Sequence, residues 1–276
     1  MQRRPGFIDA QEGRALFGSD PRNYNDIRPP YPEQLYEFLL TTGALRANTS
    51  TLEVGAGNGL ATRRLLDCGA HPLTVVEPDT RFAPLLMSLS KLYKVELRFI
   101  AESFEDAVLP RSHYDLVAAA TSFHWIQPAI GLTKAAAFLK PGGHIALWWH
   151  VFGDVDREDP YHEATRTILQ PLSSSPSGAP DTVPFALDTQ ARLRDFSSTG
   201  QFETPAYEAY RWTLVLNTAQ VGALYATFSS ISRLPAEQRK TILHELMEVA
   251  ERHFGGTVER NMVSPIYIAR RKPTPA

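Results

Sequence analysis

The chain of 276 residues carries 28 Lys and Arg against 30 Asp and Glu, which gives a formal net charge of −2, and 43% of its residues are hydrophobic. This composition is ordinary for a globular protein and excludes a strongly basic surface for nucleic acid or an anionic membrane. A single cysteine excludes an intramolecular disulfide framework, and no apolar run approaches the ~20 residues of a spanning helix. We therefore expect a cytoplasmic protein with no nucleic-acid and no membrane partner.

The first 45 residues contain the segment YNDIRPPYPEQLYEFL, which we interpret as an N-terminal helical cap that covers a site. Residues 46–151 then alternate between short apolar runs and helical segments. Such an alternation is typical of a parallel sheet with helices on both faces. The predicted strands are residues 51–54, 73–77, 95–101, 114–120 and 144–151. KPGG at residues 140–143 is expected to end a helix and turn the chain into the last of these strands.

After residue 151 the alternation stops. Residues 152–200 include a Pro/Ser/Gly-rich stretch without periodicity, PLSSSPSGAPDTVP, and we interpret the whole segment as an inserted lid on the substrate side. Residues 201–276 contain one strand, two helices and a closing strand or hairpin that complete the sheet. The predicted fold is therefore α/β and doubly wound, with a cap and an insertion.

A glycine-rich loop follows the first predicted strand in residues 52–60, LEVGAGNGL. Glycine permits positive φ and the close approach of a ligand to the backbone. Ligands of doubly wound sheets bind beyond the carboxyl ends of the strands, so this loop is a candidate cofactor site. A phosphate-binding P-loop is excluded because Leu60 follows Gly59, and a dinucleotide fingerprint counted from Gly55 would require glycine at position 60.

A carboxylate, Glu77, ends the second predicted strand about 20 residues beyond the glycines. A carboxylate at that place can accept hydrogen bonds from both hydroxyl groups of a ribose. This feature predicts an adenosine-containing ligand but does not separate a methyltransferase from a nicotinamide-dependent oxidoreductase.

The alternation of Glu53, Gly55, Gly57 and Gly59 resembles the first motif of the class I S-adenosylmethionine-dependent methyltransferases. TSFHW at residues 121–125, the segment FLKPGG and the N-terminal YNDIRPPYPEQLYEFL resemble the type-11 branch of that family. The resemblance implies a Rossmann-like, mostly parallel seven-stranded sheet. It also implies S-adenosyl-L-methionine as cofactor and S-adenosyl-L-homocysteine as product, and cofactor contacts from these residues: Tyr24, Arg28, Glu53, Gly55, Ala56, Gly57, Gly59, Glu77, Pro78, Ser103, Phe104, Thr121 and Ser122.

Two of these contacts have open alternatives. Ser103 and Phe104 stand where the family usually has an acid and a small residue beside the adenine. Arg28 could pair with the cofactor carboxylate or anchor the cap to the rest of the protein. RPPYP does not indicate a DNA adenine methyltransferase, because that chemistry needs its Pro-Pro-aromatic segment after the fourth strand.

His124 is the candidate catalytic residue, because a histidine near the methyl donor could deprotonate an acceptor. The alternative is that the Phe-His-Trp turn only braces the next helix. Aromatic side chains near the transferred methyl group could line a chamber for an apolar or aromatic acceptor, although aromatic residues in strands are also common core residues. The candidate substrate residues are Phe123, Trp125, Trp149 and Phe152. No cluster has metal-ligand spacing, so no metal is expected.

The leading hypothesis is thus a methyltransferase of specialised metabolism that acts on a small molecule, with O-, N- and C-methylation all open. A methyltransferase of small carboxylic acids, similar to those that act on aconitate, is an alternative that requires a cation in the substrate chamber. Arg192, Arg194 and Arg211 are available for that role. A nicotinamide-dependent oxidoreductase is the second alternative, and a homo-oligomer is left open.

Overall fold

The computed structural model describes residues 27–154, 156–172 and 182–273. Tertiary contacts divide the chain into two units, each assembled from discontinuous segments. The sheet unit consists of Pro30–Trp149, Ala186–Tyr210 and Ser264–Ala276. The helical unit consists of Met1–Pro29, His150–Phe185 and Arg211–Val263.

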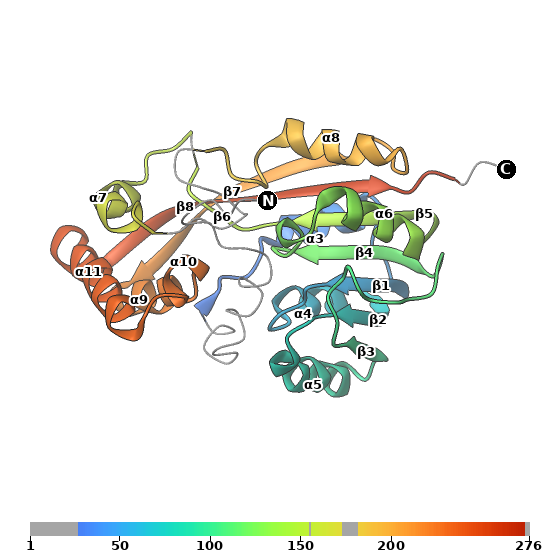
Figure 1. Ribbon diagram of the computed structural model, residues 1–276, viewed down its shortest axis with the longest axis horizontal. Helices are drawn as coiled ribbons and strands as arrows, with labels where there is room; N and C mark the ends of the chain where they lie inside the picture. Colours follow the sequence, from blue (N-terminus) through green and yellow to red (C-terminus); the bar gives the residue numbers. More distant parts are fainter. Residues whose placement is uncertain (1–26, 155, 173–181, 274–276) are drawn as a thin grey trace. The chain divides into compact units, whose positions relative to one another are not determined.

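The central sheet has the strand order β3-β2-β1-β4-β5-β8-β6, with β7 also paired to β8 (Figure 1). The first five strands in the chain are parallel, and β8 is antiparallel to both β5 and β6. The order reverses between β1 and β4, which makes the carboxyl ends of these two strands the expected ligand position. The strands are β1 (Thr49–Val54), β2 (Ala70–Val76), β3 (Leu97–Ile100), β4 (Tyr114–Ala120), β5 (Leu139–Trp148), β6 (Val151–Phe152), β7 (Ala206–Asn217) and β8 (Thr257–Arg270).

Five α-helices and two short 3₁₀ turns belong to the sheet unit. They are α3 (Glu33–Thr41), α4 (Leu60–Asp67), η2 (Thr80–Phe82), α5 (Ala83–Tyr93), η3 (Phe123–Trp125), α6 (Pro128–Phe138) and α8 (Thr189–Thr199). Proline occupies the start of α6, where its missing N–H costs no hydrogen bond. Asp188 caps the start of α8, where its side chain accepts the N–H of Ala191, and Gly200 caps its end in the left-handed conformation.

A hydrophobic core joins α3 and α4 to one face of this sheet. Leu35 and Leu39 of α3 and Leu65 of α4 are fully buried with Ala118 of β4 and Ala146 of β5. The small side chains of the two alanines let the helices approach the sheet closely, and the leucines supply the apolar area that holds the layer together. This packing places the start of α4, and therefore the glycine loop before it, at the carboxyl end of β1.

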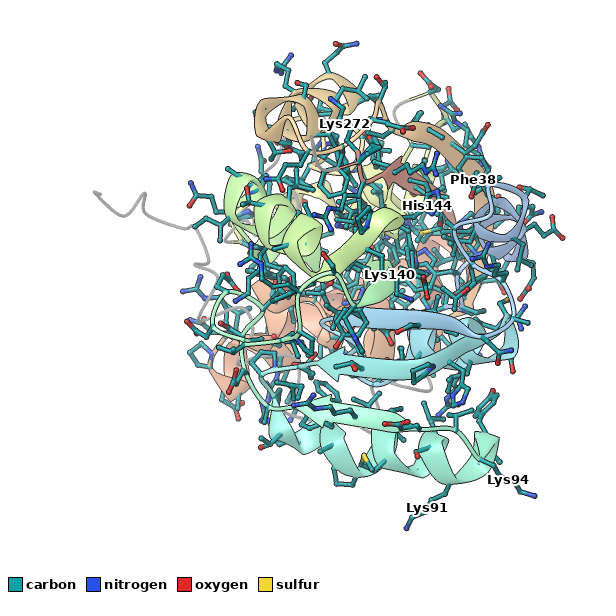
Figure 2. The ribbon with its side chains drawn as sticks, turned by 90° about the vertical axis from the view of Figure 1, so that its right-hand side faces the viewer. Phe38, Lys91, Lys94, Lys140, His144 and Lys272 are labelled. Carbon is teal, nitrogen blue, oxygen red and sulfur yellow. The ribbon has the colours of Figure 1, made fainter. Side chains whose placement is uncertain are left out.

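Charged groups at the amino-terminal end of β5 form structural contacts. Lys140 donates to both carboxylate oxygens of Asp115 at 2.9 Å, and Figure 2 labels Lys140 in this position. Lys91 and Lys94 at the end of α5 project outward from the sheet unit and are exposed (Figure 2). Because β5 begins at Leu139, the KPGG segment lies within this strand and is not a separate turn before it.

The helical unit contains α7 (Pro160–Leu169), α9 (Thr218–Ala226), α10 (Ser229–Ser232) and α11 (Ala236–Phe254). Helix α9 begins with a complete capping box, in which Asn217 and Gln220 satisfy each other's backbone N–H groups. The core of the helical unit includes Leu224, Leu246 and Val258, all with no exposed surface.

A buried ion pair lies inside the helical unit. Arg260 is 2% exposed, and its Nε donates to Asp159 at 2.9 Å. The guanidinium also donates to the Tyr225 hydroxyl, and the Asp159 side chain caps α7 through the N–H of His162. One carboxylate therefore both neutralises a buried cation and starts a helix.

The predicted α/β class with a mostly parallel sheet is confirmed. The sheet has eight strands where seven were expected, and the two-residue β6 accounts for the difference. The division of the sequence at residues 45, 151 and 200 stays a prediction. The contact-defined units differ from it, because one boundary falls between residues 185 and 186, inside the expected lid.

Candidate functional site

The loop from β1 to α4 has a backbone that only glycine adopts without strain. Gly55, Gly57 and Gly59 all have positive φ, at 69°, 52° and 81°. The N–H of Gly55 donates to the carbonyl of Val76, and the N–H of Gly59 donates to the carbonyl of Ala56. The loop is thus tied to β2 and closes tightly before α4 begins. Ala56 within it is 7% exposed.

The three glycines have different surroundings. A Cβ on Gly55 would lie 2.6 Å from the Cβ of Ser122, and a Cβ on Gly59 would lie 3.0 Å from Leu89. A Cβ on Gly57 would meet no atom of the described residues within 4 Å. Gly55 and Gly59 are therefore required by packing as well as by φ, whereas Gly57 borders open space that a ligand can use.

Glu77 connects the glycine loop to the chain after β2. Its Oε2 accepts the N–H of Gly57 at 2.9 Å, and its Oε1 accepts the N–H of Asp79 at 3.0 Å. The side chain is 7% exposed, while the next residue, Pro78, is exposed. A carboxylate oxygen can accept more than one hydrogen bond. Glu77 therefore positions the loop in addition to the role that its spacing predicts.

Glu53 lies within β1, just before the glycine loop, and is 1% exposed. Its Oε2 accepts the hydroxyl of Thr62 at 2.7 Å, and its Oε1 has no hydrogen-bond partner among the described residues. Burial raises the pKa of Glu53 from its ordinary value of 4.5 to about 7, and the nearby Glu77 carboxylate adds to this rise. Near neutral pH, Glu53 is therefore protonated in a large share of the molecules, which reduces the negative charge beneath the glycine loop.

The chain after β4 forms the second wall of the site. Ser122 donates its hydroxyl to the carbonyl of Val54 at 2.5 Å, which brings this segment against the glycine loop. Thr121 has a φ of 50°, uncommon for a β-branched residue, and its hydroxyl lies 2.7 Å from that of Tyr31. The structure therefore brings Thr121 and Ser122 together with the glycine loop, at the point where the strand order reverses.

His124 follows in η3 and is enclosed. It is 8% exposed, and its Nδ1 accepts the indole N–H of Trp149 at 3.1 Å. Burial lowers the pKa of His124 from 6.5 to about 3, so the imidazole is neutral at physiological pH.

The predicted substrate residues divide between the two units. Phe123, Trp125 and Trp149 belong to the sheet unit and are 2%, 7% and 2% exposed. Phe123 packs so closely on α6 that a Cβ on Gly131 would lie 2.6 Å from its ring. Phe152 belongs to the helical unit, where its ring lies 5.0 Å from that of Phe228.

The segment predicted to meet the adenine forms a local turn. Ser103 donates its hydroxyl to Asp106 at 2.6 Å and accepts the N–H of the same residue. Phe104 is 3% exposed and packs edge-on against Phe138, with ring centroids 6.1 Å apart. Phe104 therefore anchors the turn in the core, and Ser103 fixes its shape.

Arg28 lies in the helical unit. Its Nη2 donates to the carbonyl of Thr227 at 3.1 Å, and its guanidinium lies 5.0 Å from the centroid of the Phe228 ring and 5.8 Å from that of Phe152. These contacts hold Arg28 within the helical unit, and whether it also pairs with the cofactor carboxylate stays a prediction. Tyr24, the other predicted cap contact, lies outside the described residues.

The sequence did not single out several residues that shape the site, among them Asn58, Thr62 and Asp79. Thr62 is a polar residue with no exposed surface in the first turn of α4, and its burial follows only once α4 is placed on β1. Asn58 carried a local signal, because asparagine in a tight loop often accepts a nearby backbone N–H, as it does here from Leu60 at 3.1 Å.

Within the described part of the chain, no three His, Cys, Asp or Glu side chains are placed to hold a metal ion. A search of the same residues finds no helix with the length and apolar character needed to span a membrane.

Comparison with known proteins agrees with this geometry. Residues 52–147 match the type-11 family model described as a methyltransferase domain. An uncharacterized methyltransferase from Schizosaccharomyces pombe is 27% identical over 84% of this chain and 86% of that protein.

Solved structures share the fold at low sequence identity. The [4+2]-cyclase SpnF has a TM-score of 0.59 at 14% identity, with full coverage of both chains. Phosphoethanolamine N-methyltransferase 2 from Haemonchus contortus, in complex with phosphomonomethylethanolamine and S-adenosylhomocysteine, has a TM-score of 0.52 at 13% identity, covering 96% of this chain and 57% of that one. These likenesses establish the fold alone. The family match assigns residues 52–147 to the type-11 methyltransferase domain.

Proposed function

We propose that the protein transfers a methyl group from S-adenosyl-L-methionine to a small-molecule acceptor. The observation that carries the proposal is the glycine loop at the strand-order reversal. All three of its glycines have positive φ, and the middle one borders open space beside the Glu77 carboxylate. Such a loop can hold the amino acid and ribose portions of the cofactor against its backbone.

The residues present fit this cofactor. Gly57 offers room for a ligand to contact the backbone, and Glu77 can accept hydroxyl protons while it holds the loop. When bound, S-adenosylmethionine supplies a methyl group that is already electrophilic. The remaining task of the chain is to align the acceptor in line with the methyl group and to exclude water.

The enclosed aromatic residues around η3 support an apolar or aromatic acceptor from specialised metabolism. For a carboxylic acid acceptor, the chain would need an available cation in the acceptor chamber. Arg192 is 8% exposed and pairs with Asp195 at 2.7 Å, whereas Arg211 pairs with Asp154 and Asp156 at 3.1 and 2.9 Å. An acidic acceptor would therefore have to displace an ion pair to bind Arg192 or Arg211, whereas Arg194, the third candidate, is exposed.

Calorimetric titration tests the cofactor. We expect S-adenosylmethionine and S-adenosylhomocysteine to bind and NADH not to bind. Binding of NADH alone would indicate an oxidoreductase and reject the proposal. The acceptor class is tested by following formation of S-adenosylhomocysteine with matched panels of apolar aromatic compounds and of small carboxylic acids. Turnover confined to the acid panel would overturn the preferred class.

A further inference from the structure

The hydrogen bond between Trp149 and His124 determines where the imidazole carries its proton. An indole N–H can only donate, so the nitrogen that faces it must be an unprotonated acceptor. The acceptor here is Nδ1, at 3.1 Å from the Trp149 Nε1. A neutral His124 therefore carries its proton on Nε2. A doubly protonated imidazolium would place a second N–H against the indole N–H and lose the bond.

The donor in this pair is held firmly. Trp149 is 2% exposed, and its backbone N–H donates to the carbonyl of Pro265 at 3.2 Å. Its ring packs edge-on against Tyr267, with centroids 6.2 Å apart, and the Tyr267 hydroxyl donates to the carbonyl of Ala186 at 2.8 Å. The indole N–H therefore cannot turn away from His124 without disturbing a buried aromatic cluster.

The surroundings of the imidazole also disfavour a positive charge. The next residue in η3 is Trp125, and its ring centroid lies 5.1 Å from that of His124. Burial is the one cause that lowers the pKa of His124, and no carboxylate among the described residues opposes it. A neutral imidazole with Nδ1 already occupied has no free nitrogen lone pair for a proton from an acceptor.

We propose that Trp149 holds His124 in the neutral tautomer that is protonated on Nε2, and that His124 is not the proton acceptor of methyl transfer. Trp149 is then a positioning residue, in place of the substrate contact that its sequence position predicted. The exclusion of His124 as the proton acceptor rests on the proposed function, whereas its tautomer is a property of the chain alone.

Ring-nitrogen NMR of protein labelled with [15N]histidine tests the inference. The chain has eight histidines, and His124→Asn identifies the signals of His124 by their loss. We expect an unprotonated Nδ1 and a protonated Nε2 at every pH from about 8 to about 5, well below the ordinary histidine pKa. The same pattern is expected with S-adenosylhomocysteine present. A protonated Nδ1, or titration near pH 6.5, would overturn the inference.

Two matched variants test the role of Trp149. Trp149→Phe removes the N–H and keeps an aromatic ring, so His124 should populate both tautomers. Trp148→Phe, at an equally buried neighbour in β5, should leave the His124 signals unchanged. Amide spectra report whether each variant is folded. An unchanged tautomer in folded Trp149→Phe would show that Trp149 does not fix it. Failure of S-adenosylhomocysteine to bind would reject the proposed function without altering the tautomer measured in the free protein.

Discussion

Glu53→Gln should make the protein more stable at alkaline pH, although it removes a charge from the candidate site. Glu53 is 1% exposed and its Oε1 has no hydrogen-bond partner among the described residues. Glutamine keeps the shape and can still accept the Thr62 hydroxyl that now bonds to Oε2. The variant therefore removes the cost of a buried negative charge with little change in packing.

The magnitude follows from the pKa. Burial raises the pKa of Glu53 from 4.5 to about 7, and each unit corresponds to about 1.4 kcal/mol. Between these values the unfolded chain has lost the proton while the folded chain keeps it, so the stabilising effect of the raised pKa is complete below pH 4.5 and is lost as pH rises to 7. The advantage of Glu53→Gln should therefore grow from about 1 kcal/mol at pH 5 to about 3 kcal/mol at pH 8.

Urea unfolding of wild type and variant at both pH values measures this difference. Glu37→Gln on α3 is the matched control, because Glu37 is exposed and its replacement should give no such pH-dependent gain. A Glu53→Gln advantage that is equal at pH 5 and pH 8 would refute the reasoning, as would a wild type that is more stable than the variant at pH 8.

Three further changes have defined outcomes. Glu77→Ala leaves the N–H groups of Gly57 and Asp79 without their acceptor, so calorimetric affinity for S-adenosylhomocysteine should fall at least about tenfold; an unchanged dissociation constant would exclude Glu77 from the site. Arg260→Met leaves the buried Asp159 unpaired and should lower the free energy of unfolding by about 3–5 kcal/mol, with partial recovery when Asp159→Asn is added; no recovery would locate the loss in packing. Because the folded pKa of His124 is about 3, its stabilising contribution is complete above pH 6.5 and is lost on acidification. Wild type should therefore lose about 2 kcal/mol more than His124→Asn between pH 6.5 and pH 5 in urea unfolding, and parallel losses would contradict the assigned burial effect.

The local features of the site could be predicted from the sequence. Apolar runs that alternate with helical segments predicted the parallel sheet, and the alternating glycines predicted a loop with positive φ. The position of Glu77 after β2 predicted a carboxylate at the same edge of the sheet, where it now holds the loop. These predictions depend on periodicity and spacing within short stretches, which the sequence displays directly.

Features that depend on distant contacts could not be predicted. The contact between Gly55 and Ser122, and the pairing of His124 with Trp149, require the order of β1, β4 and β5 in the sheet. Helix α8 was missed because its sequence, TQARLRDFSST, is mostly polar and follows a stretch typical of a loop. The burial of Phe123, Trp125 and Trp149 could not be predicted either, because the sequence gives no sign of which elements will pack on η3 and on the end of β5, and their role towards a substrate stays a prediction.

The central claim is that the space beside Gly57 holds the cofactor, and a matched pair of variants tests it most directly. Gly57 and Gly43 both have positive φ, at 52° and 72°, and a Cβ on either meets no described atom within 4 Å. Valine at either position therefore introduces similar backbone strain, but only at Gly57 does its side chain enter the proposed site. Calorimetry with S-adenosylhomocysteine should show wild-type affinity for Gly43→Val and at least about a tenfold loss for Gly57→Val. Equal affinities of the two folded variants would contradict the account.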